Sequence, residues 1–165
     1  MPEREVVRYP ASVLKTPTQP LEPGPEAEAL AKDLVDTMHA SAHSVGIAAT
    51  QIGVAKSMFV LDITGHKKAN SQHGLIVMMN PMILSRDDSD VGREGCMSVP
   101  DFTGDVRRAS RIVVKGQRPD GETFIVEADA FEARALQHEI DHLSGLLFLD
   151  RVESSNALFQ RKRYR

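Results

Sequence analysis

The feature that most constrains the fold is a pair of histidines four residues apart, His138 and His142, with Glu139 directly after the first. Four residues turn an α-helix by about 400°, so the two imidazoles would lie one turn apart on the same helix face. Side chains placed in this way can bind one metal ion, and the segment has the His-Glu-x-x-His form of catalytic metal sites. The alternative is two unrelated histidines, in the core or on the surface, with a solvated acid between them.

The residues around this pair favour a helix over residues 129–143. Asp129 is a good N-cap residue, and Glu132, three positions later, predicts a capping box. Apolar residues continue to Leu143, and Gly145 is a typical residue for ending a helix. The two histidines are therefore expected to project from the second half of one helix.

The remaining pattern predicts a second helix and several short strands. Gly24-Pro25 favours a helix start, and the apolar stripe that follows should end near Ala40. These elements indicate an α+β fold, namely a single compact domain with antiparallel or mixed short β-sheets around a central metal-binding helix, plus this N-terminal helix. The expected strands are 58–63, 75–79, 111–115 and 123–127, the last two joined by a Pro-Asp-Gly turn, and residues 64–74 are expected to form an exposed loop.

No repeat, low-complexity tract or linker divides the 165 residues, so a single catalytic domain over residues 1–165 is expected. Residues 1–24 contain five prolines and should form an extended arm laid along the domain. Residues 153–165 end in a cluster of basic side chains and should form a tail.

Charge and hydropathy argue against two classes of partner. The formal net charge of −3 argues against a broad nucleic-acid-binding surface, so no sequence-specific nucleic acid is expected. No apolar run approaches the roughly 18 residues that a membrane span needs. The N-terminus begins Met-Pro-Glu-Arg-Glu without an apolar stretch behind it, which is not typical of a targeting segment. A cytoplasmic protein without membrane contact is therefore expected.

Cys96 is the only cysteine, so no intramolecular disulfide can form. A lone cysteine is often a small buried apolar side chain. Here, however, it lies in the segment 94–100, which predicts a loop hinged by Gly95 and ended by Pro100, not a core strand or helix. Zinc-type hydrolytic sites use three protein ligands and keep one position for water, so Cys96 is the natural third ligand beside the two histidines.

Helix geometry does not choose between the two acids near these histidines. Glu139 and Asp141 lie about equally far, on opposite sides, from the mean direction of the two imidazoles. Glu139 has the longer reach, but its assignment as the general acid and base rests mainly on the motif. Asp141 is expected to be a supporting or surface acid.

Three ordered segments, taken together, resemble the polypeptide deformylases. Residues 94–100 match the family's Glu-Gly-Cys-x-Ser-x-Pro motif, and residues 137–143 match its Gln-His-Glu-x-Asp-His-Leu motif. Residues 44–51 are similar to its Gly-x-Gly-x-Ala-Ala-x-Gln motif, except that Ser44 replaces the first glycine. Serine would be strained there only if the position needs a positive φ. The resemblance extends from about residue 6 to residue 152.

The resemblance implies a hydrolase that removes the formyl group from the N-terminal formyl-methionine of newly synthesised polypeptides. It implies that the partners are N-formyl-methionyl nascent peptides, with one divalent metal ion as cofactor. The implied roles are metal ligands for Cys96, His138 and His142, the general acid and base for Glu139, oxyanion donors for the Gln51 side chain and the Met97 N–H, and a close approach for the substrate backbone at Gly46.

Coordination chemistry and the family resemblance imply different metals. One cysteine and two histidines favour zinc by coordination preference. The resemblance instead implies Fe2+ in the cell, with Zn2+, Ni2+ or Co2+ able to replace it in purified protein.

The role of the C-terminal tail stays open. Its basic residues Arg161, Lys162, Arg163 and Arg165 are a candidate for ribosome contact, with a solvated tail as the alternative.

Two other functions also stay open. The chain is compatible with a metalloamidase or peptidase of other specificity. It is also compatible with a non-catalytic metal-binding relative, for which Ser44 is the only hint in the sequence.

Overall fold

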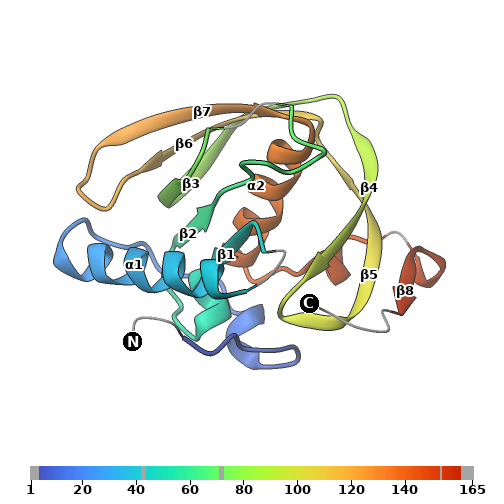
Figure 1. Cartoon of the computed structure of the whole chain (residues 1–165), viewed down its shortest axis with the longest axis horizontal. Coiled ribbons are helices and arrows are strands. Elements are labelled where there is room, and N and C mark those ends of the chain that lie inside the picture. The colour runs from blue at the N-terminus through green and yellow to red at the C-terminus, as the bar shows by residue number, and fades with distance from the viewer. Residues whose placement is uncertain (1–3, 42–43, 71–72, 153, 161–165) are drawn as a thin grey trace.

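Two antiparallel sheets enclose one central helix, α2 (Ala130–Leu143), in this computed structural model (Figure 1). The structure describes residues 4–41, 44–70, 73–152 and 154–160, so the basic residues 161–165 lie outside it. The α+β fold expected from the sequence is confirmed, and every pairing between the named strands is antiparallel.

The larger sheet has five strands in the order β1-β2-β3-β6-β7. One strand, β3, is much longer than the expected strand 75–79, because it continues through Asn80-Pro81 instead of ending there. The register shifts across this dipeptide, between Met79 and Met82, and Asn80 has a positive φ of 50°, as expected where a bulge accommodates a proline inside a sheet. The strands are β1 (Gly46–Ala48), β2 (Met58–Leu61), β3 (Ile76–Asp87), β6 (Arg111–Gln117) and β7 (Thr123–Asp129).

The smaller sheet contains the cysteine. It consists of β4 (Asp90–Cys96), β5 (Val99–Arg108) and β8 (Leu158–Gln160). The expected loop around Cys96 is therefore wrong: Cys96 is the last residue of β4, and only residues 97–98 form the turn into β5. The sequence hides this strand because one face of it carries Asp90, Gly92 and Glu94 where an apolar face would signal a strand.

The two predicted helices are present as α1 (Pro25–Ala40) and α2. The capping box expected at the start of α2 is wrong, because Asp129 occupies the N-cap position without a capping hydrogen bond from its side chain. Glu132 instead accepts hydrogen bonds from the backbone N–H of His73 at 2.8 Å and from its Nδ1 at 2.7 Å. In the described residues, no helix is both long and apolar enough to cross a membrane.

The main core lies between α2 and the five-stranded sheet. Leu136 of α2 packs there in a cluster with Phe59, Met78 and Val114 from the middle of that sheet. This packing fixes one face of α2, and the opposite face is left to carry polar side chains toward β4.

The arm before α1 runs along the domain next to the cysteine turn. The Val7 N–H donates to the Gln51 carbonyl at 2.7 Å, and the Tyr9 N–H donates to the Ser98 carbonyl at 2.7 Å. The arm is not extended throughout, since it contains a 3-10 turn, Ser12–Lys15. The other 3-10 turns are Ala49–Ile52, Phe148–Asp150 and Ser155–Ala157.

Candidate metal centre

Cys96, His138 and His142 come together in the folded chain. Their candidate ligand atoms all lie within 4.8 Å of one another, and Cys96 Sγ lies 3.5 Å from His142 Nε2. All three side chains are almost fully enclosed by the protein, with exposed fractions of 5%, 9% and 0%. One thiolate and two imidazoles form the donor set of a catalytic zinc-type site. The residues therefore fit a single divalent metal ion.

The three side chains come from only two elements, β4 and α2. On α2, His138 and His142 occupy successive turns of the face that the sheet core leaves uncovered. On β4, Glu94 and Cys96 are both buried, whereas Gly95 between them is exposed. The metal centre therefore depends on how β4 is held against α2.

Glu94 orients the first histidine. Its Oε1 lies 2.9 Å from His138 Nδ1, while Arg108 donates to both carboxylate oxygens at 2.9 Å each. Burial alone would raise the pKa of Glu94, but the hydrogen bonds from Arg108 and His138 hold that pKa well below its ordinary value. An ionised Glu94 can only accept, so His138 Nδ1 carries the proton and Nε2 is left for a metal.

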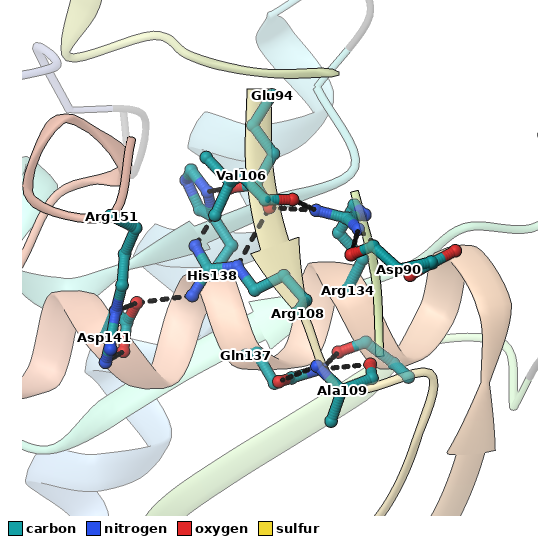
Figure 2. Close-up of polar contacts among 11 residues, drawn as sticks. Asp90, Glu94, Val106, Arg108, Ala109, Arg134, Gln137, His138, Asp141 and Arg151 are labelled. Atoms are coloured by element: carbon teal, nitrogen blue, oxygen red, sulfur yellow. Dashed lines mark hydrogen bonds and ion pairs between the residues drawn. The ribbon is translucent and has the colours of Figure 1, made fainter. Parts of the chain in front are cut away.

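Figure 2 shows that this contact belongs to a chain of polar contacts that runs from Asp90 to Arg151. Arg108 also donates to Asp141 Oδ2, and Asp141 accepts from Arg151 at 2.9 and 3.0 Å. On the other side of Glu94, Arg134 donates to its Oε2 at 2.8 Å. Asp141 is therefore a supporting acid whose carboxylate is taken up by two arginines.

Glu139, by contrast, keeps one carboxylate oxygen uncommitted. Its Oε1 is fully buried and has no hydrogen-bond partner among the described residues. Burial raises the pKa of Glu139 to about 7; the nearby His138 opposes this rise and Glu94 adds to it. A carboxyl group with a pKa near neutrality can both take up and release a proton, as a general acid and base must. This contrast with Asp141 favours Glu139 for that role.

The titration of the two histidines suits a bound cation. Burial lowers the pKa of His142 well below its ordinary value, and the charges of His138 and Arg108 lower it further, so His142 is neutral and able to coordinate. Burial also opposes protonation of His138, but hydrogen bonds with Cys96 and Glu94 raise its pKa well above the ordinary value. Without a metal, His138 therefore favours its protonated form, and a metal ion bound at its Nε2 would displace that proton.

Gln51 lies in the 3-10 turn after β1 with its amide directed at the cysteine. Its Nε2 donates to Cys96 Sγ at 3.4 Å and to Ser98 Oγ at 3.2 Å. Its Oε1 accepts the Ala48 N–H at 3.0 Å, which fixes the orientation of the amide. The –NH2 group is thus held as a donor beside the metal ligands.

Gly46 and Met97 complete the set of predicted site residues. A Cβ atom added to Gly46 would lie 2.8 Å from Glu139 Oε2, so only glycine leaves room for that carboxylate. Met97 is the first residue of the two-residue turn after Cys96, which places its backbone next to the thiolate. Ser44, the departure from the first motif, donates from its Oγ to the Gly46 carbonyl at 3.3 Å.

Two polar residues close in sequence to the candidate ligands have different contacts. Glu94 contacts His138 directly. Gln137 instead binds the backbone of Ala109 at 3.0 and 2.9 Å. Nothing in the sequence singles out Arg108. It is the last residue of β5, a strand that the sequence pattern does not predict, so it carries no local signal of burial.

Comparison with known proteins identifies the family. The polypeptide deformylase family model matches residues 3–157. A peptide deformylase of Halothermothrix orenii is 41% identical over 153 residues, covering 92% of this chain and 95% of the relative. The crystal structure of a peptide deformylase from Legionella pneumophila matches with a TM-score of 0.84 and 36% identity, covering 94% of this chain and 88% of that one. A Met-Ala-Ser-bound peptide deformylase of Acinetobacter baumannii matches with a TM-score of 0.82 and 32% identity, covering 91% and 98% of the two chains.

These matches span nearly the whole chain, so they confirm the resemblance carried by the three motifs. They also agree with the buried Cys/His/His cluster, since the family is metal-dependent. This chain belongs to the polypeptide deformylase family, the hydrolases that remove the N-terminal formyl group from newly synthesised polypeptides.

Proposed function

We propose that Cys96, His138 and His142 hold the catalytic metal of this deformylase and that Glu139 is its general acid and base. The observation that carries the proposal is the buried Glu139 Oε1, which has no hydrogen-bond partner among the described residues and belongs to the residue directly after His138 on α2. Unpartnered buried carboxylate oxygens are costly and rare outside functional sites. We further propose Fe2+ as the metal in the cell, with Zn2+, Ni2+ or Co2+ able to occupy the site in purified protein.

When bound, a divalent metal supplies a nucleophile at neutral pH by lowering the pKa of a coordinated water. Glu139 accepts the proton that the attacking water loses, and later delivers it to the amine of the leaving methionine. The pKa of about 7 for Glu139 in the metal-free chain fits a group that both accepts and donates this proton.

Two donors of this chain face the oxygen that becomes negative during the attack. The Gln51 –NH2 group is held beside Cys96 by its bonds to Ser98 and Ala48. The Met97 N–H is proposed as the second donor, from the turn that follows the cysteine. Donors fixed in advance stabilise the developing charge without reorganising during the reaction.

Gly46 and the free edge of β1 are proposed to receive the substrate backbone. β1 is an edge strand of the larger sheet, and a peptide can add to such an edge as a further strand. The Met-Ala-Ser-bound relative supports a peptide that begins with methionine as the ligand of this site. Nascent formyl-methionyl chains would meet the enzyme in the cytoplasm.

A contact with the ribosome through the basic residues 161–165 remains a separate proposal, supported only by their charge. Deleting these five residues and measuring co-sedimentation with ribosomes tests it. Unchanged binding after the deletion would remove the idea without affecting the catalytic proposal.

The activity is tested with three matched peptides that carry an N-formyl, an N-acetyl or a free methionine. Anaerobically purified protein should release formate from the first and leave the acetyl group on the second. Removing the metal with a chelator should abolish formate release, and adding back Fe2+ or Co2+ should restore it. Equal cleavage of the acetyl peptide would instead indicate an amidase of broader specificity.

A further inference from the structure

Arg134 is a buried arginine on the metal-binding face of α2. It lies one helical turn before His138, and its exposed fraction is only 8%. Arginines are almost never buried unless their charge and donors are paired. Its position beside the metal ligands therefore calls for a specific role.

The guanidinium of Arg134 binds strand β4 and the neighbouring strand β5. Its Nη1 donates to Glu94 Oε2 and to the Val106 carbonyl, each at 2.8 Å. Its Nη2 donates to the carbonyl oxygen and to Oδ1 of Asp90, at 3.0 and 3.2 Å. Figure 2 shows the guanidinium between Asp90, Glu94 and Val106, with its stem rising from α2. One side chain thus ties the helix to both ends of a β4 segment.

Gly92 provides the space for this guanidinium. Successive side chains of a strand point to opposite faces, so Asp90, Gly92 and Glu94 share the face of β4 that meets Arg134. A Cβ atom at Gly92 would lie 2.9 Å from both Cζ and Nε of Arg134. The backbone of Gly92 has an ordinary negative φ, so its lack of a side chain matters for room and not for conformation. The Arg134 guanidinium therefore occupies the space that a side chain at position 92 would need.

We infer that Arg134 is a positioning residue for the metal centre, acting through Glu94. This inference rests on the proposed metal site. The Glu94 carboxylate receives two donors on each oxygen: His138 and Arg108 on Oε1, Arg108 and Arg134 on Oε2. Losing Arg134 removes one of the two arginines that set its angle, and therefore loosens the imidazole of His138.

Arg134 also sets the distance between the two ligand-bearing elements. Cys96 is on β4, whereas His138 and His142 are on α2, and Arg134 is anchored on α2 and bound to β4. A change in this contact therefore moves the thiolate relative to the imidazoles, although among the described residues Arg134 has no hydrogen bond to any of the three.

The test replaces Arg134 by methionine, which keeps the apolar stem, and by lysine, which keeps the charge. Co2+ is loaded into the parent protein and each variant, and its affinity is measured by competition with a chelator. The absorption bands of bound Co2+ report the ligand geometry. Arg134→Met should weaken Co2+ binding by about tenfold and shift these bands, and Arg134→Lys should restore part of both. With formyl peptide, kcat should fall while KM stays the same.

Arg93→Met is the matched control. Arg93 lies on the same strand but on its exposed face, where it pairs with Asp105 and stacks on Phe159. Its loss should leave Co2+ affinity and the absorption bands as in the parent protein.

Gly92→Ala tests the same contact with Arg134 intact, and it covers the case in which Arg134→Met does not fold. The three atoms nearest to the added methyl group all belong to the guanidinium end of Arg134, so the guanidinium should shift while the fold survives. It should weaken Co2+ binding in the same direction as Arg134→Met but less, and adding it to Arg134→Met should cause no further loss.

Parent-like Co2+ affinity and bands in both Arg134→Met and Gly92→Ala would overturn the positioning role. So would a change confined to KM, which would place the guanidinium against the substrate. The proposed deformylase function would fail separately, through absence of metal-dependent formate release in the parent protein.

Discussion

Glu94 Oε1 and His138 Nδ1 are 2.9 Å apart, and this one contact assigns the proton on the histidine. Because Arg108 keeps Glu94 ionised, the carboxylate must accept and His138 Nδ1 must donate. His138 Nε2 then keeps its lone pair for the metal, and the imidazole is made a stronger ligand by the charge behind it. A strand residue thus prepares a helix residue for coordination.

Replacing Glu94 by glutamine should destabilise the protein and weaken its metal site together. The change leaves Arg108 and Arg134 buried without their shared anion, which typically costs about 3–5 kcal/mol. It also turns the acceptor of His138 into a weaker one, so metal affinity should fall by roughly 10–100-fold. Urea unfolding and chelator competition measure the two effects. Glu127→Gln, on the exposed face of β7, is the control and should change neither.

Replacing Gln51 by leucine should slow deformylation by roughly 100-fold or more, because one oxyanion donor is lost. The three proposed metal ligands are all retained, so metal content and KM should stay close to those of the parent protein. Single-turnover formate release measures the rate. Ser98→Ala removes only one of the partners that hold the Gln51 amide and should have a smaller effect. A Gln51→Leu enzyme as fast as Ser98→Ala would contradict the assigned role.

Gly46→Ala should reduce activity by displacing Glu139. The new methyl group would lie 2.8 Å from Glu139 Oε2 and also 2.8 Å from Leu61 Cδ1. A displacement of about 1 Å in a catalytic group can cost roughly 100-fold in rate, and overpacking costs about 1–3 kcal/mol. Adding Leu61→Val makes room on the Leu61 side only. Stability should then recover while activity stays low, and recovery of both would argue against the contact with Glu139.

The pH dependence of stability should reveal the burial of Glu139 in metal-free protein. Its pKa rises from an ordinary 4.5 to about 7 on folding, so the folded state binds this proton more tightly than the unfolded state does. Stability is therefore lost as the pH rises between these two values, and the loss persists above the higher one. Glu139→Gln removes the carboxyl group, so it should be more stable than the metal-free parent by about 3 kcal/mol near pH 8.

Urea unfolding of the two metal-free proteins across this pH range measures the difference. The advantage of Glu139→Gln should shrink toward pH 4.5, where the carboxyl group of the parent is protonated in the folded state. A difference that does not vary with pH would show that burial does not shift this group.

Much of the candidate site can be predicted from the sequence, because its residues lie in short segments with recognisable local patterns. His138 and His142 lie on one face only if the segment is helical, and the pattern of apolar residues around them predicts that helix. Cys96, the proposed third ligand, is identifiable because it is the only cysteine and lies in a specific motif. These residues can be singled out because each signal depends on neighbours within a few residues along the chain.

The ion pairs behind the ligands could not be predicted, because they depend on tertiary partners. The face of β4 that carries Asp90 and Glu94 is buried only because Arg108 and Arg134 arrive from another strand and from α2. A strand with charged residues on its inner face lacks the alternating apolar pattern of a strand, so the sequence of β4 predicts a loop. Helix geometry leaves the choice between Glu139 and Asp141 open for the same reason, because the arginines that bind Asp141 come from β5 and from Arg151 beyond the helix.

The central claim is that Glu139 transfers the proton beside a metal held by Cys96, His138 and His142. It is tested most directly by measuring bound metal and formate release in the same anaerobic preparations of the parent protein and Glu139→Gln. The account predicts equal metal content in both proteins and formate release at least roughly 100-fold slower in the variant. Undiminished formate release from a Glu139→Gln enzyme that retains its metal would contradict it.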